Sequence, residues 1–221
     1  MMIRYVAVAA TLVAPMLVAV APTAASAEIE LSFYGGAQSA PHSDVFVTGD
    51  LAYPAKTRVK WEGRSFDPPP YYGVRATYWA SERFGYGLDF THTKVYSSDE
   101  SREGTPFTTL EFTDGLNTLT ANAYRRFDPV GGATPYVGAG IGLAIPHVEV
   151  ANGTTSTLGY QVTGPAATVL AGVSYPVSDR FAVFGEYKFT YSQNEAELDG
   201  GGTLKTDIIT NAVNVGVSFN F

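Results

Sequence analysis

The sequence predicts an all-β fold: an eight-stranded antiparallel transmembrane up-and-down β-barrel with four extracellular loops. The clearest evidence is the C-terminal stretch Val213–Phe221, VNVGVSFNF, which is apolar at every odd position, small or polar at every even position, and ends in an aromatic residue. This period of two is that of a strand with one face in lipid and one toward a polar interior, and roughly 9 to 11 residues cross the hydrocarbon. An N-terminal export segment and further alternating segments support the same fold class.

Residues 1–27 are predicted to be a secretory signal peptide, and residues 28–221 to form the barrel domain. The first segment has a short basic start, a long apolar run and a small-residue motif at Ala25–Ala27, which is the pattern of a cleaved export signal. A transmembrane anchor is the weaker interpretation, because Pro15 and Pro22 interrupt the run and no stop-transfer charges follow. The mature protein is therefore expected in a bacterial outer membrane.

The composition excludes several classes of function. The chain has no cysteine, so the exported protein has no disulfide, no thiolate metal site and no cysteine nucleophile. Without the predicted signal peptide, whose one charged residue is Arg4, 13 basic residues stand against 21 acidic ones, a net charge of −8. This balance argues against nucleic-acid binding, and it is compatible with an outer leaflet whose anionic lipids are bridged by divalent cations.

The predicted strands are joined by alternately short and long connections, as in barrels with short periplasmic turns and longer outer loops. Strands are expected over about 28–37, Tyr72 to Tyr78, 84–96, about 115–127, Val137 to Ile145, Ala167 to Tyr175, Phe181 to Tyr191, and Val213 to Phe221. Loops are expected over 38–71, with a hairpin around Arg58 to Phe66, and over 97–114, 149–164 and 194–207, while the turns are 81–83, 128–133 and 178–180.

The interior of so small a barrel is expected to be filled by side chains, which makes a diffusion pore improbable. Inward-facing charges therefore have to pair with one another, because an isolated buried charge costs several kcal/mol; they are Arg75, Asp89, Glu186 and Lys188. Three inward glycines, at 138, 140 and 142, are expected to make room for bulky neighbours. A ligand site at these glycines is the weaker alternative.

Aromatic residues are expected to form girdles at the two membrane interfaces. The inner girdle is predicted to consist of Tyr78, Phe84, Phe127, Tyr136, Tyr175 and Phe181. The terminal Phe221 is expected to engage the barrel-assembly machinery, and the barrel is expected to be monomeric.

The three histidines all fall at the outer ends of ascending strands, at His42, His92 and His147. Histidine is the usual metal ligand and the usual general base near neutral pH. Carboxylates accompany them: Asp44 follows His42, Glu149 follows His147, and Glu111 lies on the strand or loop between His92 and His147. Strand parity places the candidate catalytic residues on the lipid-facing side near the outer headgroups: His92, Glu111, His147 and Glu149.

Their spacing allows a shared metal ion or a shared lipid headgroup. The strands that carry His92 and His147 flank one strand between them, so the side chains are expected about 9 to 10 Å apart. Two histidines and a carboxylate suit a non-haem iron or related oxygen-using site, and His92, Glu111 and His147 are the candidate ligands of a divalent metal. Each histidine has an alternative as an interface residue that binds lipid phosphate or loop backbone, and Pro146 introduces a possible bulge that reverses parity.

The sequence resembles the lipid A oxidase family of alphaproteobacterial, rhizobial-type outer-membrane proteins over nearly the whole mature chain. The segments that carry the resemblance are Pro69–Thr77, Leu110–Asn117, Pro135–Gly140, and Gly185 to the C-terminus through Tyr191–Asn194. PYVGAG is common among small barrels, whereas Glu111–Asn117 and Ser192–Asp199 are more particular.

The resemblance implies an enzyme that uses O2 to convert the proximal glucosamine of lipid A to 2-aminogluconate, with hydrogen peroxide as the other product and a divalent metal as a plausible cofactor. Its partner is then the lipid A of lipopolysaccharide in the outer leaflet. No catalytic residue is carried over from the family, so the candidate site rests on depth and strand face alone. The alternative is a non-enzymatic structural or recognition barrel, OmpA-like or adhesin-like, whose loops contact lipopolysaccharide or another surface.

Overall fold

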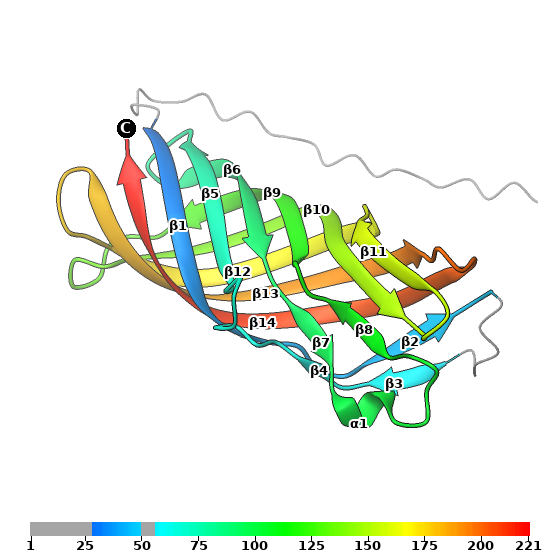
Figure 1. Ribbon diagram of the computed structural model, residues 1–221. Coiled ribbons are helices and arrows are strands. Elements are labelled where there is room, and N and C mark those ends of the chain that lie inside the picture. Colours follow the sequence, from blue (N-terminus) through cyan, green and yellow to red (C-terminus); the bar gives the residue numbers. More distant parts are fainter. Residues whose placement is uncertain (1–27, 50–55) are drawn as a thin grey trace, which may run out of the picture.

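The computed structural model describes residues 28–49 and 56–221, and the predicted signal peptide lies outside these residues. Figure 1 shows a closed antiparallel barrel of eight strands. Each barrel strand pairs with the next barrel strand along the chain, and the last pairs with the first. The eight barrel strands are β1 (Glu28–Ser39), β5 (Tyr72–Trp79), β6 (Phe84–His92), β9 (Leu116–Arg126), β10 (Thr134–Ala151), β12 (Gly164–Pro176), β13 (Phe181–Glu197) and β14 (Thr203–Asn220). The predicted fold class is therefore confirmed.

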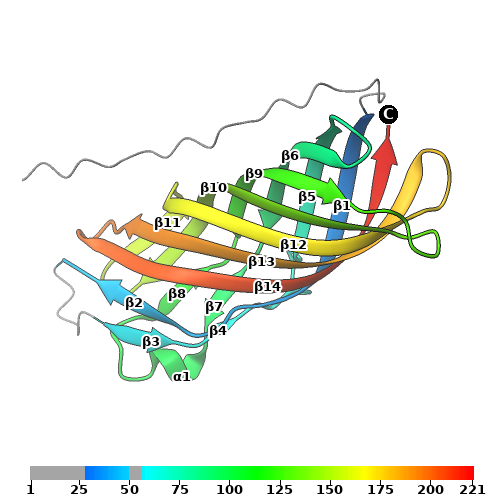
Figure 2. The ribbon, with the colours of Figure 1, turned by 180° about the vertical axis from the view of Figure 1, so that it is seen from behind.

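Within the described part of the chain, the barrel strands follow the predicted alternation. Large apolar side chains such as Phe33, Leu88 and Val215 are exposed on the outer wall, which forms the lipid-facing belt. The short connections after β5, β9 and β12 lie at the same end as the C-terminus (Figure 2). No helix among residues 28–49 and 56–221 has the length and apolarity to cross a bilayer.

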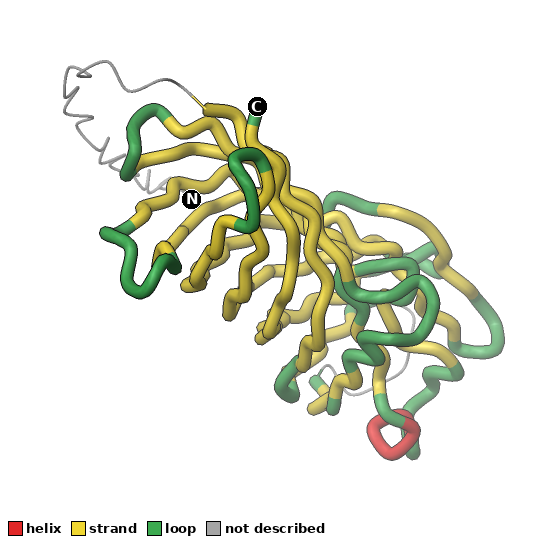
Figure 3. Tube along the Cα trace, turned by 90° about the vertical axis from the view of Figure 1, so that its left-hand side faces the viewer, coloured by secondary structure: helices red, strands yellow, loops and turns green. Residues whose placement is uncertain are grey.

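The regions predicted as long loops largely form strands, which corrects the sequence-based expectation. These strands continue the sheet beyond the outer end of the membrane barrel, and this region is here called the extension. Figure 3 shows it, with the short helix α1, at the end opposite the C-terminus. Its elements are β2 (Ser43–Val47), β3 (Thr57–Val59), β4 (Trp61–Glu62), β7 (Val95–Ser97), α1 (Asp99–Arg102), β8 (Thr109–Phe112) and β11 (Ser156–Tyr160), together with the outer ends of β10, β13 and β14. β13 and β14 stay paired from Phe181↔Phe219 to Glu197↔Thr203, so the predicted loop 194–207 shrinks to a tight connection.

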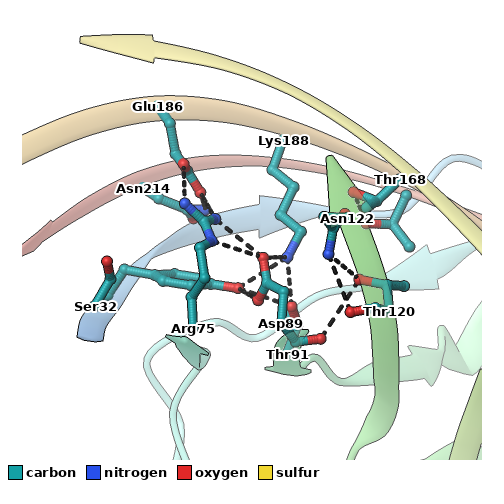
Figure 4. A network of polar contacts seen from close by, with 12 residues as sticks. Ser32, Arg75, Asp89, Thr91, Thr120, Asn122, Thr168, Glu186, Lys188 and Asn214 are labelled. Atoms are coloured by element: carbon teal, nitrogen blue, oxygen red, sulfur yellow. Dashed lines mark hydrogen bonds and ion pairs between the residues drawn. The ribbon is translucent and has the colours of Figure 1, made fainter. Parts of the chain in front are cut away.

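The membrane-embedded interior is closed by a charge network of two cations and two carboxylates (Figure 4). The Arg75 guanidinium donates to Asp89 Oδ2 at 3.0 Å and to both Glu186 oxygens at 2.8 and 3.0 Å. The Lys188 ammonium donates to the same Asp89 Oδ2 at 2.9 Å and to the hydroxyls of Tyr34 and Thr91. All four charges are buried, and the predicted internal pairing is confirmed.

Bulky aromatic side chains fill the interior around this network, and inward-facing glycines leave the space that these rings occupy. A Cβ on Gly138 would lie 2.6 Å from the Tyr124 ring, so this glycine makes room for a bulky neighbour as predicted. Tyr136, predicted in the inner girdle, instead points inward and donates its hydroxyl proton to Glu186 at 2.7 Å. The reason is parity, because Val137 faces lipid and its neighbour must face the opposite way.

The interior of the extension is apolar instead of charged. A continuous hydrophobic cluster fills it, with Trp61 packed against Phe112 at 6.2 Å between ring centroids. Its members come from β2, β3, β4, β7, β8, β9, β10, β13 and β14 and from the links beside them. The largest fully buried apolar members include Phe112, Leu110, Leu116, Leu204 and Ile208. The extension is thus packed like a water-soluble barrel, whereas the lower part has the reversed polarity of a membrane barrel.

We expect Arg75→Ala to destabilise the barrel by about 3–5 kcal/mol, because it leaves Asp89 and Glu186 with Lys188 as their remaining cation in the network. The measurement is urea unfolding of the protein refolded into phospholipid vesicles. Arg83→Ala is the control, since its pair with Asp128 is exposed at both ends and should cost less than about 1 kcal/mol. Equal losses for the two variants would contradict a structural role of the network.

Candidate lipid-facing site

His92 and His147 lie on the outer wall at the extracellular ends of β6 and β10, on the face predicted from the sequence. The register of β9 with β10 runs without a break to Leu116↔Pro146, so Pro146 does not reverse parity. What separates the two histidines is the turn Asp114–Gly115 that leads into β9. The His147 backbone N–H donates to the Gly115 carbonyl at 2.8 Å, and a Cβ on Gly115 would lie 2.5 Å from His92 Nδ1.

Gly115 is needed for this close approach. Its φ of +113° belongs to the region that favours glycine, and the absent side chain lets the His92 imidazole lie against the turn. Both histidines therefore contact the same short piece of backbone from opposite sides.

The His92 ring is almost fully buried, with 5% exposure, although it faces outward. It stacks on Tyr72 with 5.1 Å between ring centroids, and Nδ1 lies 2.8 Å from Asn117 Oδ1. An amide oxygen only accepts hydrogen bonds, so Nδ1 carries the proton and Nε2 keeps a lone pair. Among the described residues, Nε2 has no hydrogen-bond partner.

The His147 ring is held by an acidic turn and an aromatic edge. Its Nδ1 lies 3.9 Å from Asp114 Oδ2 and has no hydrogen-bond partner within the described residues. The ring meets Tyr160 edge-on at 4.8 Å between centroids, and the Tyr160 hydroxyl donates to the Asp114 carbonyl at 2.9 Å. Asp114, Asn117, Tyr72 and Tyr160 are thus site residues that sequence reasoning missed.

The two glutamates lie beside each other instead of between the histidines. Glu111 on β8 and Glu149 on β10 are register partners, and the Thr113 hydroxyl donates to Glu149 at 2.7 Å. Burial, and then repulsion from Glu149, raise the pKa of the Glu111 carboxyl above its ordinary value. His42 lies in the exposed link between β1 and β2 and joins neither group.

The expected metal site is not assembled by these residues. Across residues 28–49 and 56–221, no three histidine, aspartate or glutamate side chains converge on a point that a metal ion could occupy. The physical reason is the pairing of β8 with β10, which places Glu111 against Glu149. His92, Glu111 and His147 therefore do not fit a shared metal ion, and no chemistry below is routed through one.

A closed barrel with an apolar outer wall, a charged interior and short turns at the end of its termini is a small outer-membrane β-barrel. The chain belongs to the outer membrane protein beta-barrel domain family, whose model matches residues 10–221. The protein is accordingly located in the bacterial outer membrane.

Solved structures with the same fold include the outer membrane protein OprG from Pseudomonas aeruginosa, at 14% identity and a TM-score of 0.53, covering 89% of this chain and 96% of that one. The outer membrane protein AlkL, solved in lipid bilayers, has 13% identity and a TM-score of 0.50, covering 100% of this chain and 97% of that one. At these identities the likeness establishes the fold alone. No curated protein matches the sequence.

We expect Glu111→Gln to stabilise the protein at neutral pH by up to about 1 kcal/mol. A folded-state pKa raised above the unfolded value means that the folded protein holds the proton more strongly. The free energy of unfolding therefore falls as the pH rises through the interval between those two pKa values. Urea unfolding at about pH 4 and about pH 7 measures this difference.

The control for this prediction is Glu82→Gln, in the exposed turn after β5. It gives the effect of the same substitution at an exposed position, measured at the same two pH values. A Glu111→Gln variant with the parent's pH dependence would show that burial and repulsion from Glu149 do not raise the pKa of the Glu111 carboxyl in the folded protein.

Proposed function

We propose that this protein is a lipid A oxidase that acts on its substrate at the outer wall of the barrel. The observation that carries the proposal is the position of two imidazoles, His92 and His147, at the outer end of the lipid-facing wall, each with a ring nitrogen free of hydrogen-bond partners among the described residues. A lipid of the outer leaflet reaches this wall without entering the barrel. The sequence resemblance to lipid A oxidases supports the same substrate.

The proposed reaction is oxidation of the free anomeric hydroxyl of the proximal glucosamine. The C1–H and O1–H bonds break, a C1=O bond forms, and O2 takes up the two electrons and two protons as H2O2. Water then opens the resulting lactone to 2-aminogluconate, so the sugar gains one oxygen atom overall. The balance requires O2 as co-substrate and a sugar without a phosphate on its anomeric oxygen.

In this proposal the residues of the chain bind the sugar and move its proton. His92 Nε2 carries the lone pair of a neutral imidazole whose tautomer is set by Asn117. This nitrogen is buried, so the side chains that cover it have to move aside before Nε2 accepts the proton of the anomeric hydroxyl. The Asp114 carboxylate lies 3.9 Å from His147 Nδ1, beside the space that the sugar would occupy in this proposal. The Tyr160 edge and the Tyr72 face keep the two rings in fixed orientations.

We expect cells that make the protein to gain an oxygen-dependent addition of one oxygen atom on the proximal sugar of lipid A, compared with matched cells that lack it. Mass spectrometry of lipid A from cultures grown with and without air measures it, in a strain whose lipid A carries a free anomeric hydroxyl. His92→Gln and His147→Gln should each lower product formation by about 10²-fold or more, because a positioned proton acceptor contributes on that order.

His42→Gln is the matched control, because it removes the one histidine outside the cluster, and it should keep full activity. The heat-dependent gel mobility of each variant reports whether its barrel has assembled. Unchanged lipid A with a correctly assembled parent barrel would refute the oxidase.

A non-enzymatic recognition barrel is the second candidate, and one observation favours it. The histidines and glutamates form separate pairs within the described residues, without the convergent ligand set expected for an oxygen-using metal. In that case the same imidazoles bind lipid phosphate groups, and lipid A remains chemically unchanged in every variant.

A further inference from the structure

The outer face of β11 carries an exposed apolar stripe, whereas most apolar side chains of the extension point inward. Leu158, Tyr160 and the following Val162 point outward and are 64%, 59% and 64% exposed. Thr157 and Thr163, which flank the stripe in the sequence, are polar and buried, and Gly159 and Gln161 within it are half-buried. β11 is therefore apolar outside and polar inside, as a strand in lipid would be.

The neighbouring strand of the extension has the opposite polarity. On β13 and its partner β14, Ala196 and Leu204 are buried in the apolar core, whereas Glu195 and Lys205 form an exposed ion pair at 2.9 Å. An outward apolar residue on β2, Phe46, is covered by the Lys56 ammonium at 5.4 Å from the ring centroid. Leu158, Tyr160 and Val162 stay exposed, although Leu158 is the register partner of Glu149 on β10 and the Tyr160 hydroxyl donates to the Asp114 carbonyl.

The stripe continues the lipid-facing belt of the barrel. β11 pairs with the outer part of β10 through His147↔Tyr160, and the chain then runs directly into β12. Figures 1 and 2 both show β11 beside β10 and β12, on the side of the extension away from α1 and β3. Below it, the belt on β10 and β12 exposes Ile141, Leu143 and Val169.

The stripe ends where β11 faces β13, a boundary here called the seam. Across the seam, side chain–backbone hydrogen bonds take the place of backbone pairing between the strands. The Gln161 amide exchanges two hydrogen bonds of 2.9 Å with the Glu197 backbone, and the Asp199 N–H donates to Thr157 Oγ1 at 2.9 Å. These side chains satisfy backbone groups of Glu197 and Asp199 on the β13 side of the seam. Beyond the seam the outer face is charged.

We propose that the outer face of β11 is a lipid-binding surface that lies against the acyl chains of an outer-leaflet lipid. The hydrocarbon boundary is then higher on the β10–β11 side of the barrel than on the β13–β14 side. The occupant is an acyl chain because the stripe is continuous with the belt and inverts the polarity of the extension. This contact does not depend on any chemistry at the histidines.

The test uses nitroxide labels on single introduced cysteines, which the cysteine-free chain makes unambiguous. Leu158→Cys and Val162→Cys probe the stripe, Ile141→Cys marks the middle of the belt, and Lys205→Cys marks the charged face. Each labelled protein is reconstituted into vesicles of palmitoyl-oleoyl-phosphatidylcholine. Collision rates with apolar oxygen and with a water-soluble nickel complex are then measured.

We expect positions 158 and 162 to resemble position 141, with oxygen collisions frequent and nickel collisions several-fold rarer than at position 205. Nickel accessibility equal to that at position 205 would place the stripe in water and overturn the proposal. Labels shielded from both reagents would overturn it too, because they would indicate a protein partner or a second copy on the stripe. Loss of oxidase activity in any variant has no bearing on this result.

Discussion

The barrel depends on the mutual neutralisation of Arg75, Asp89, Glu186 and Lys188 at its centre. These side chains come from β5, β6 and β13, so the ion pairs join strands that are far apart in the sequence. Hydrophobic packing alone cannot hold the interior together here, because many apolar side chains of these strands face lipid and the inward aromatic cluster surrounds buried charges. Paired charges and hydroxyls take that role, and they leave no room for a water-filled channel.

The polarity of the inward face changes along single strands. On β14, Asn214 and Thr210 face the polar interior of the membrane barrel, while Ile208 and Leu204 face the apolar core of the extension. The change follows the surroundings, because outside the hydrocarbon the outer face must be wet and the inner face can be apolar. The candidate site lies near this transition, where a lipid headgroup meets the wall.

Features that depend on local alternation were predictable from the sequence, and features that depend on distant pairing were not. The barrel strands, the inward charges and the outward His92 and His147 follow from a period of two. The position of Glu111 does not, because β8 pairs with β10, past the turn that leads into β9. Tyr136 was predicted in the girdle from its residue type, although the parity of its own strand already directed it inward.

The strand β14 also runs through both the membrane barrel and the extension and connects them. It pairs with β1 and β13 in the membrane and with β2 and β13 above it, as one uninterrupted strand from Thr203 to Asn220. A paired strand of this length joins the extension to the membrane barrel without an intervening loop in β14. Force applied to the outer surface of the cell, through whatever binds the extension, is therefore carried to the C-terminal end of the protein.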